Sequence, residues 1–514
     1  MFDRFDRPRV VVVERPWPPL AEVWVQLPVG SLADPDGVEG LSYLAWQTAI
    51  EAGGKRNSTA YARALDVIGA TLDVDVGLRR TIVHGQVPTL HIKKFMSLLS
   101  DVVLRPQFDA DDFKRKRKLA IADAHASMDD DEVLADDAAM RYLHRGEPVG
   151  RSAEGTAKSL KKVTLSAAKK LHARAIRTAM RFGFAGDLRR QPALELVDRY
   201  FPDSEGSKKP LTNRKTQPPK LAGRRLLVLN RPGRTQAQIV ILVPTVGANS
   251  AKMPAMAIAA TALGGTFTSR LVRQVRELRG WSYSLDADLE IGYDTGVIAI
   301  RWAPQNRVTA ASIDLVMGQL ELLRATGLTK PELRFIKDHL KGAHRLAIET
   351  AAGEMAERMR ALALGLPIDY PQRLSALIGR VDRKFLSAAL VQHFDPSRAV
   401  AVVVGDAAVL STSLAKMTSG FAVETIAYTA SPEATTVVGN LVSVTKLAKP
   451  PPPPDPNASA ETGPIFDESG DPVDEAQLPE GDTSTDDDDA LDDGAVDEDA
   501  DAPPDDPPPT IRRG

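Results

Sequence analysis

Histidine is the residue type in this chain best suited to metal or acid–base chemistry, and its spacing forms no zinc motif. The eight histidines are His84, His91, His125, His144, His172, His339, His344 and His393. None belongs to an H-E-x-x-H or H-x-x-E-H run, and His339 and His344 lie five residues apart, off a common helical face. We therefore interpret all eight as surface or partly buried side chains. Cysteine is absent, which excludes disulfides, thiolate zinc sites and cysteine catalysis.

The charge of the chain is divided between a basic body and an acidic tail. Residues 451–514 carry 21 Asp and Glu against two Arg, a net charge of −19, although the whole chain has a net charge of only −3. Residues 1–450 therefore carry 63 Lys and Arg against 47 Asp and Glu, a net charge of +16. The basic residues are scattered, with few aromatics among them, so we expect a solvated surface and no nucleic-acid partner.

Targeting and membrane signals are weak. No apolar run approaches the roughly 20 residues that span a bilayer, so we expect no membrane span. The start, MFDRFDRPRVVVV, lacks a basic region followed by an apolar stretch. As written, the chain is expected in the cytoplasm. A misassigned start codon would hide an upstream signal sequence, and the protein would then be periplasmic.

An internal repeat organises the body into two similar halves. Residues 10–28 align without a gap on 226–244, and each copy predicts a strand, an Arg-Pro turn and a second strand. Near the ends of the halves, 163–176 parallels 381–394. We expect a domain over 1–201, a linker over 202–223, a second domain over 224–430 and a disordered Pro- and Asp-rich acidic tail over 448–514.

Helices are predicted between the strands of each half. Apolar residues recur at helical spacing, and Asp109 and Thr329 stand where N-caps are expected. The predicted helices cover 38–50, 91–103, 110–127, 252–263, 267–279, 308–325 and 330–349. The fold class is therefore α+β, with two tandem homologous α/β-sandwich halves and the tail.

Several segments carry a resemblance to a known family. They are VGSLADPDGVEGLSYLAWQTAI (29–50), GATLDVDV (69–76), VVLRPQFDADDFKRKRKLAIAD (102–123), LGGTFTSRLVRQVRELRGWSYS (263–284), ETAAGEMAERM (349–359) and GLPIDYPQR (365–373). In this order they resemble the pitrilysin/insulinase-type zinc metallopeptidases, over nearly all of 1–430. The resemblance implies two similar two-domain units, on two chains or fused, that enclose a chamber around a peptide.

The zinc motif of that family is lost in this chain. Relatives carry H-x-x-E-H on a helix, with two zinc-binding His and a Glu that activates the metal-bound water. Here the His positions are Tyr43 and Gln47, and the Glu position is Trp46. The third ligand falls at Asp123 or, with a one-residue slip, at Ala124. We expect no metal in this chain, with zinc in a partner. Tyr43 and Trp46 either fill the space with apolar bulk or form an aromatic wall that binds peptide.

A second feature of the family is kept. Relatives supply an Arg and a Tyr with the spacing R-x6-Y after a glycine-rich segment, and Arg276 and Tyr283 match it. The resemblance implies that the Tyr hydroxyl donates to a substrate carbonyl oxygen as it becomes negative, while the Arg holds the peptide. Gly280 would end the Arg-bearing helix. Arg270, Arg273, Arg276 and Arg279 also fit the alternative, a helix that simply faces solvent.

Two functions follow from the resemblance. In the first, the chain is the non-catalytic subunit of a heterodimeric zinc peptidase, like the α subunit of the mitochondrial processing peptidase. Arg276 and Tyr283 would then serve an H-x-x-E-H partner in trans, on peptides or small unfolded proteins. In the second, it is a structural or binding scaffold, like the core proteins of the cytochrome bc1 complex. The acidic tail is either a solubilising segment or a regulator of access to the basic body.

Overall fold

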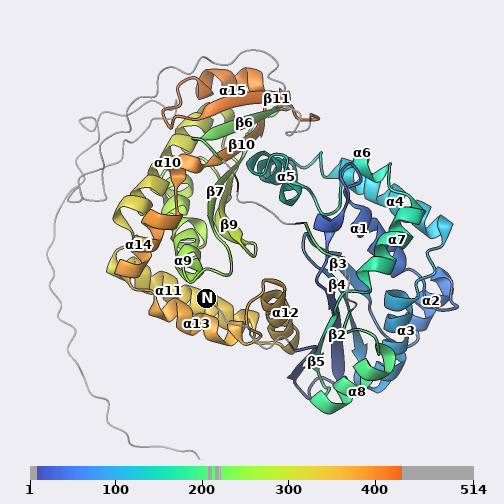
Figure 1. Cartoon of the computed structure of the whole chain (residues 1–514). Helices are drawn as coiled ribbons and strands as arrows, with labels where there is room; N and C mark the ends of the chain where they lie inside the picture. Colours follow the sequence, from blue (N-terminus) through green and yellow to red (C-terminus); the bar gives the residue numbers. More distant parts are fainter. Residues whose placement is uncertain (1–7, 207–210, 215–218, 220, 431–514) are drawn as a thin grey trace, which may run out of the picture. The chain divides into compact units, whose positions relative to one another are not determined.

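Two β-sheets with the same strand order form the framework of the protein. The computed structural model describes residues 8–206, 211–214, 219 and 221–430. The first sheet has the order β1 (Val10–Glu14), β5 (Arg181–Gly186), β2 (Leu20–Leu27), β4 (Thr81–Pro88), β3 (Asp73–Val76). The second has the order β11 (Ala422–Ala427), β6 (Arg225–Asn230), β10 (Val400–Gly405), β7 (Gln238–Val246), β9 (Thr295–Trp302), β8 (Leu285–Ile291) (Figure 1).

The matching topology confirms the repeat that the sequence indicated. β5 pairs in parallel with β1 and antiparallel with β2, and β10 does the same between β6 and β7. The aligned segments 10–28 and 226–244 thus supply the first two strands of each sheet. They do not form a hairpin, because the last strand of the repeat inserts between them. The second sheet has one additional strand, β11, parallel to β6.

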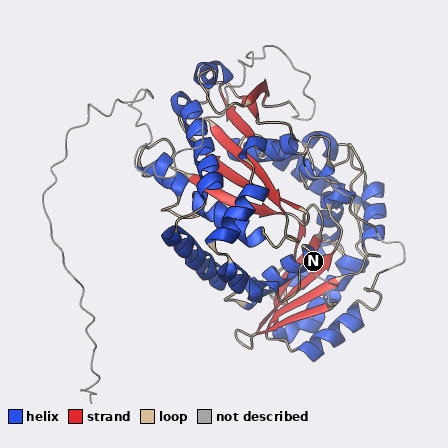
Figure 2. Ribbon diagram, turned by 60° about the vertical axis from the view of Figure 1, so that its left-hand side comes forward, coloured by secondary structure: helices blue, strands red, loops and turns tan. Residues whose placement is uncertain are grey.

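Helices cover the sheets as expected for two α/β-sandwich halves. Their bounds are α1 (Leu41–Ala49), α2 (Ser58–Asp66), α3 (Ile92–Leu104), α4 (Ala110–Ala126), α5 (Asp131–Leu143), α6 (Ala157–Leu160), α7 (Leu165–Ala175), α8 (Arg190–Tyr200), α9 (Met253–Gly264), α10 (Thr309–Thr326), α11 (Lys330–Ala347), α12 (Ala351–Ala363), α13 (Tyr370–Arg380), α14 (Arg383–His393) and α15 (Ala407–Leu414). In the first half, α1, α3 and α7 lie on one side of the strands, and in the second half α9, α10 and α14 do so (Figures 1 and 2).

The other face of each sheet is covered by a helix from the opposite half. α5, in the first half of the sequence, packs Leu134, Ala138 and Tyr142 on apolar residues of β6, β7 and β10. α12, in the second half, packs Met355 and Met359 on β1 and β5. The approach of α12 is close, because a Cβ on Gly183 of β5 would lie 2.7 Å from the Met355 sulfur. The exchange buries apolar surface that neither half could cover alone.

An arginine at equivalent positions of the repeat accompanies each exchanged helix. Arg15, just after β1, lies 3.5 Å from the carboxylate of Glu354 in the first turn of α12. Arg231, just after β6, lies 2.5 Å from Asp131 in the first turn of α5. In each half, therefore, an arginine that follows the first strand pairs with a carboxylate in the first turn of the helix that comes from the other half.

The predicted helix ends are largely confirmed, with one exception. Asp109 accepts hydrogen bonds from the backbone N–H groups of Asp111 and Asp112, and Thr329 forms a capping box with Glu332. The helix predicted over 267–279 starts later, and residues 272–277 form a π-helix. The segment before it forms a separate turn, in which the N–H and hydroxyl of Ser269 both donate to the Thr266 carbonyl.

The structure describes part of the predicted linker, namely residues 202–206, 211–214, 219 and 221–223. Within 202–223, Leu211 is buried in the first core, and the amide of Asn213 donates to the carbonyl of Arg79 at 2.7 Å. This part of the segment is therefore docked, since it has an apolar anchor and a polar one. The predicted tail over 448–514 lies outside the described residues. In the part of the chain that the structure describes, no helix is long and apolar enough to cross a membrane.

Because α12 packs on the sheet of the other half, a substitution at the centre of that contact should strongly destabilise the protein. Met355→Ala removes a fully buried side chain and should lower the free energy of unfolding by about 2–5 kcal/mol in urea titrations. Leu346→Ala, on the neighbouring α11 and 77% exposed, is the matched control and should cost less than about 0.5 kcal/mol. Equal losses in the two variants would contradict a packed α12.

Candidate functional site

Helix α1 carries the three positions of the degenerate zinc motif, and they point in different directions. Trp46 is 1% exposed and lies in the first core, with its ring 4.8 Å from that of His172 on α7. Tyr43 and Gln47, on an adjacent face of the helix, are only partly buried. Trp46 therefore serves the core, and the interpretation of this residue as space-filling bulk fits its position better than a peptide-binding wall does.

Tyr43 and Asp123 do come together. Both line a cavity of about 570 Å³, together with Ala124 of α4 and residues of the 151–159 segment, including Glu154. Burial raises the pKa of Tyr43, and the nearby carboxylates of Glu154 and Asp123 raise it further. The phenol is therefore neutral at physiological pH, a form in which oxygen is a poor ligand for zinc.

Gln47 is engaged by a lysine that the sequence reasoning did not single out. The Lys116 ammonium lies 3.5 Å from the Gln47 side-chain oxygen and 2.7 Å from a carboxylate oxygen of Glu51, which lies just after the end of α1. Arg115 pairs with Glu51 as well. Burial by itself would raise the pKa of Glu51, but the hydrogen bonds from Lys116 and Arg115 lower it overall. The sequence did not predict this contact between Lys116, Arg115 and Glu51, because nothing in the spacing of these residues indicates that they meet.

These residues do not fit a zinc ion. The set offers a neutral phenol, an amide oxygen and one exposed carboxylate, and Lys116 places a positive charge beside the amide where a dication would be repelled. Across the described ranges, no three His, Cys, Asp or Glu side chains are grouped so that they could hold a metal. No step of metal chemistry can be assigned to these described side chains.

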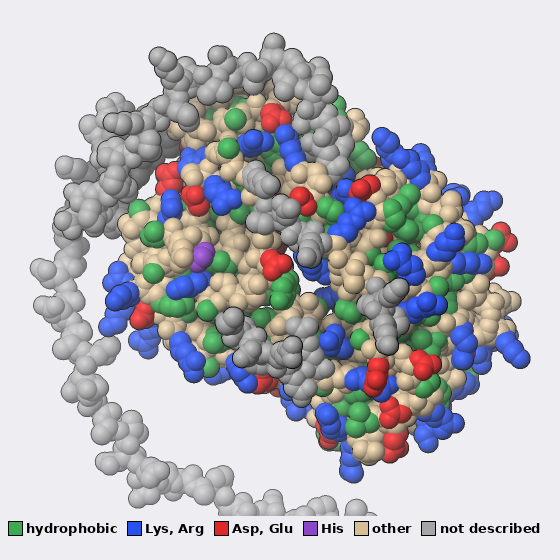
Figure 3. Space-filling model, in the orientation of Figure 1, with side chains coloured by type: hydrophobic (Ala, Val, Ile, Leu, Met, Phe, Trp, Pro, Cys, Tyr) green, Lys and Arg blue, Asp and Glu red, His purple; other side chains and the backbone are tan. Residues whose placement is uncertain are grey.

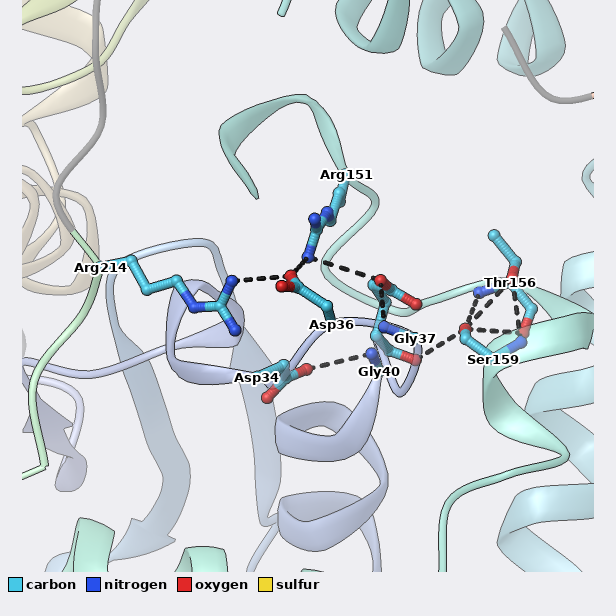
Figure 4. A network of polar contacts seen from close by, with 9 residues as sticks. Asp34, Asp36, Gly37, Gly40, Arg151, Thr156, Ser159 and Arg214 are labelled. Carbon is cyan, nitrogen blue, oxygen red and sulfur yellow. Dashed lines mark hydrogen bonds and ion pairs between the residues drawn. The ribbon is translucent and has the colours of Figure 1, made fainter. Parts of the chain in front are cut away.

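A polar network fixes the start of α1 (Figure 4). The buried Asp34 accepts hydrogen bonds from the N–H groups of Gly40 and Ser42, each at 3.0 Å, and from the Ser42 hydroxyl. Burial raises the pKa of Asp34 to about 7, against the lowering effect of these hydrogen bonds. Gly40 has φ +87°, and a Cβ there would meet the backbone oxygen of Glu154 at 2.3 Å. The chain thus enters α1 in one fixed geometry.

The same network joins the predicted linker to the first half. Asp36 accepts from Arg151 and from Arg214 of the linker segment, both at 2.7 Å (Figure 4). Arg151 also lies 3.4 Å from Glu39. The sequence reasoning quoted this stretch as part of a family motif but assigned these residues no role. The structure gives them a positioning role around the degenerate motif.

Arg276 and Tyr283 are brought together by an unusual local backbone. Arg276 lies near the end of the π-helix 272–277, and Gly280 follows with φ +60°. The Gly280 N–H donates to the Arg276 carbonyl and the Trp281 N–H to that of Val275. The chain then reverses so that the Tyr283 ring lies 5.0 Å from the Arg276 guanidinium. π-Helical turns often occur at functional sites.

Both side chains of the pair are available to a ligand. Tyr283 is 86% exposed, and its hydroxyl makes no hydrogen bond with any described residue. Arg276 forms no ion pair within the described ranges, whereas Arg270 of the same segment binds Glu332 at 2.8 Å. A second exposed aromatic, Phe267, lies under the Arg276 guanidinium at 5.8 Å. Sequence reasoning missed Phe267, whose only signal was an aromatic residue in a glycine-rich turn.

The distribution of charge agrees with the scattered pattern of basic residues in the sequence. Lys and Arg side chains are spread across the visible face of the molecule, interspersed with Asp and Glu (Figure 3). No single basic stripe of the kind that tracks a nucleic-acid backbone is seen on that face.

Comparison with known proteins relates both halves to one group of peptidases. Residues 9–157 match the family model described as insulinase (peptidase family M16), and residues 164–340 match that of the peptidase M16 inactive domain. An uncharacterised zinc protease of Mycobacterium leprae is 26% identical over 354 residues, which is 68% of this chain and 78% of that protein.

Solved structures share the fold. The peptidase M16 inactive domain from Pseudomonas fluorescens superposes with a TM-score of 0.71 at 21% identity, covering 77% of this chain and 95% of that chain. The periplasmic protease PqqL from Escherichia coli gives a TM-score of 0.64 at 15% identity, covering 77% of this chain but only 46% of PqqL. This chain thus matches less than half of that longer protein.

Restoring the catalytic base position should destabilise the fold. Trp46→Glu places a carboxylate in the first core and leaves a cavity against His172, so it should lower the free energy of unfolding by more than about 3 kcal/mol. Gln47→His, at a partly exposed position one residue away, should cost below about 1 kcal/mol. Urea denaturation measures both. A well-tolerated Trp46→Glu would contradict the core role of this tryptophan.

His172 should make stability depend on pH. Burial lowers its pKa to about 4 from an ordinary 6.5, although a hydrogen bond to the backbone of Val103 acts in the other direction. Between these values the unfolded chain binds the proton more readily than the folded one. Stability should therefore fall as the pH falls from 6.5 to 4, by at most about 1.4 kcal/mol per pH unit from this group.

His172→Leu removes that titrating group at similar volume. Its free energy of unfolding, measured in urea from pH 8 to pH 4, should fall less steeply on acidification than that of the wild type. Parallel curves for the two proteins would show that His172 does not stay neutral in the folded state.

Proposed function

We propose, from the premise that this chain belongs to the pitrilysin/insulinase (M16) peptidase family, that it is the non-catalytic subunit of a two-chain zinc peptidase. Its partner is a homologous subunit that carries an intact H-x-x-E-H motif and the zinc ion. The pair hydrolyses peptides or small unfolded proteins. This chain contributes Arg276 and Tyr283 to the site in trans.

The observation that carries the proposal is the open Arg276–Tyr283 pair. Tyr283 is 86% exposed and its ring lies 5.0 Å from the Arg276 guanidinium, and within the described residues neither its hydroxyl nor that guanidinium has a hydrogen-bond or ion-pair partner. Two other arginines of the same segment have side-chain partners: Arg270 binds Glu332, and Arg279 donates to the Gln274 side-chain oxygen. The Arg276 guanidinium also contacts two exposed aromatic rings, those of Phe267 and Tyr283.

The geometry suits contacts with a peptide backbone. The Arg276 guanidinium can donate to carbonyl or carboxylate oxygens while it lies over the Phe267 and Tyr283 rings, 5.8 and 5.0 Å from their centroids. The Tyr283 hydroxyl can donate to a carbonyl oxygen that gains negative charge during hydrolysis, and such donors contribute most when water is excluded. The partner would supply the metal-activated water, because Tyr43, Trp46 and Gln47 do not fit that chemistry.

The comparison with PqqL is consistent with a pair of homologous units. This chain covers 46% of PqqL, a single chain long enough to contain two units of this size. A separate partner subunit would complete an equivalent pair. The competing function is a scaffold without a role in catalysis. A scaffold does not require an exposed tyrosine beside an arginine that has no ion pair within the described residues, so this pair supports the first function.

The test is co-expression of this chain with an H-x-x-E-H homologue from the same genome. Hydrolysis of a quenched fluorescent peptide library is measured for each chain alone and for the purified pair. We expect activity only in the pair, and we expect Arg276→Ala or Tyr283→Phe to lower kcat about a hundredfold or more. Arg273→Ala, an exposed arginine of the same π-helix, is the matched control and should retain activity.

Each result separates the functions. If the purified pair is active and neither Arg276→Ala nor Tyr283→Phe changes its kcat, this chain is a scaffold. Failure of the two chains to associate would remove the subunit proposal. Activity of this chain alone, retained after treatment with a chelator, would reveal a catalytic site that the motif positions do not contain.

A further inference from the structure

A cavity of about 410 Å³ lies along one face of α13 and shares no lining residue with the candidate site. Its lining residues recur at intervals of three or four along the chain, so they belong to one side of the helix. They are Pro367, Tyr370, Arg373, Ala376, Leu377 and Arg380. This α13 groove is mostly apolar and carries two guanidinium groups. The helix itself lies next to α11 and α12 (Figure 1).

Positive charge is in excess at the end of α13. Arg380 forms no ion pair or side-chain hydrogen bond with any described residue, whereas Arg373 binds Asp369 one turn earlier. Lys337 of α11 donates to the Gly379 carbonyl at 2.7 Å, so a further positive charge lies close to Arg380. An occupant of the α13 groove should therefore present apolar side chains together with carboxylates.

The residues that precede the described part of the chain carry both kinds of group. Residues 2–7 read Phe-Asp-Arg twice, so each residue type recurs after three positions. In a helix of three residues per turn, such as polyproline II, Phe2 and Phe5 share one side and Asp3 and Asp6 share another. These two sides match the apolar and the cationic parts of the α13 groove, and the two arginines of the repeat fall on a third side.

The α13 groove is within reach of this segment. The described chain begins at Pro8, two residues before β1, and α12 covers β1. Ile368, next to the groove residue Pro367, packs against the apolar cluster that contains Val11 of β1. Seven extended residues span up to about 23 Å, whereas a helix with its side chains is about 10–12 Å across. The segment is therefore long enough to pass α12 and arrive at α13 of the second half.

We propose that residues 1–7 bind in the α13 groove as a strap between the two halves. Phe2 and Phe5 enter the apolar part of the groove, and Asp3 and Asp6 pair with its two arginines. The occupant is a segment of the same chain, and the strap adds to α5 and α12 a third connection that crosses between the halves. The inference is independent of the proposed function, because it involves neither the Arg/Tyr pair nor a partner subunit.

Cysteine accessibility in the full-length chain tests the strap. The chain contains no cysteine, so Ala376→Cys introduces a single thiol into the α13 groove. Ala376 is exposed among the described residues, and in an open groove this thiol reacts rapidly with a large maleimide reagent. We expect labelling at least about tenfold slower than in the same variant with Phe2→Ser and Phe5→Ser, because the strap must leave before the reagent enters.

Charge reversal gives a second readout of the same thiol. Arg373→Glu together with Arg380→Glu should speed the labelling of Ala376→Cys about two- to tenfold, the effect of losing two exposed ion pairs. Asp3→Arg and Asp6→Arg, added to the same chain, should restore the protection. A charge reversal that leaves the labelling rate unchanged would overturn the pairing of the aspartates with the groove.

A matched control separates the strap from a general change in the protein. Val409→Cys, on α15 and 53% exposed, should react at one rate with and without the serine substitutions. Equal labelling of Ala376→Cys with and without those substitutions would overturn the proposal. Protection that appears only as the protein concentration rises would overturn it as well, because a second copy of the chain would then fill the groove.

Discussion

The exchange of helices between the two halves is the constraint on which the rest of the structure depends. Each sheet receives helices of its own half on one face and a helix of the other half on the opposite face. Without α12, the Met355 contact with β5 would be lost and the inner face of β1 and β5 would meet water. The same holds for α5 on β7 and β10. The two halves therefore stabilise each other, and apolar burial favours folding of the pair over either half alone.

The packing also gives a structural role to each position of the degenerate motif. The Trp46 side chain belongs to the first core and contacts the His172 ring. Lys116 and Glu51 occupy the polar face beside Gln47 with an ion pair that neutralises itself. Asp34 and Gly40 keep the entry to α1 in the geometry that the helix needs. The motif helix has become a structural element.

Around Arg276, in contrast to α1, large side chains are left exposed to solvent. Two aromatic rings remain largely in water, and the arginine that contacts both has no carboxylate partner among the described residues. The π-helix and Gly280 bring Arg276 and Tyr283 together, although the chain leaves the helix between them.

The sequence by itself determined the two-half architecture, the absence of an H-x-x-E-H run and the spacing of Arg276 and Tyr283. These depend on local patterns: alternating strands, the offset of 216 between repeats, and residue types at motif positions. Only the tertiary structure decided that α5 and α12 cross to the opposite sheets, that Trp46 faces the core, and that Phe267 lies beside Arg276. Each of these depends on contacts between residues far apart in the chain, such as Met355 with Gly183, or on a turn whose shape local propensity does not specify. Periodicity tells which face of a helix is apolar, but not which sheet that face will cover.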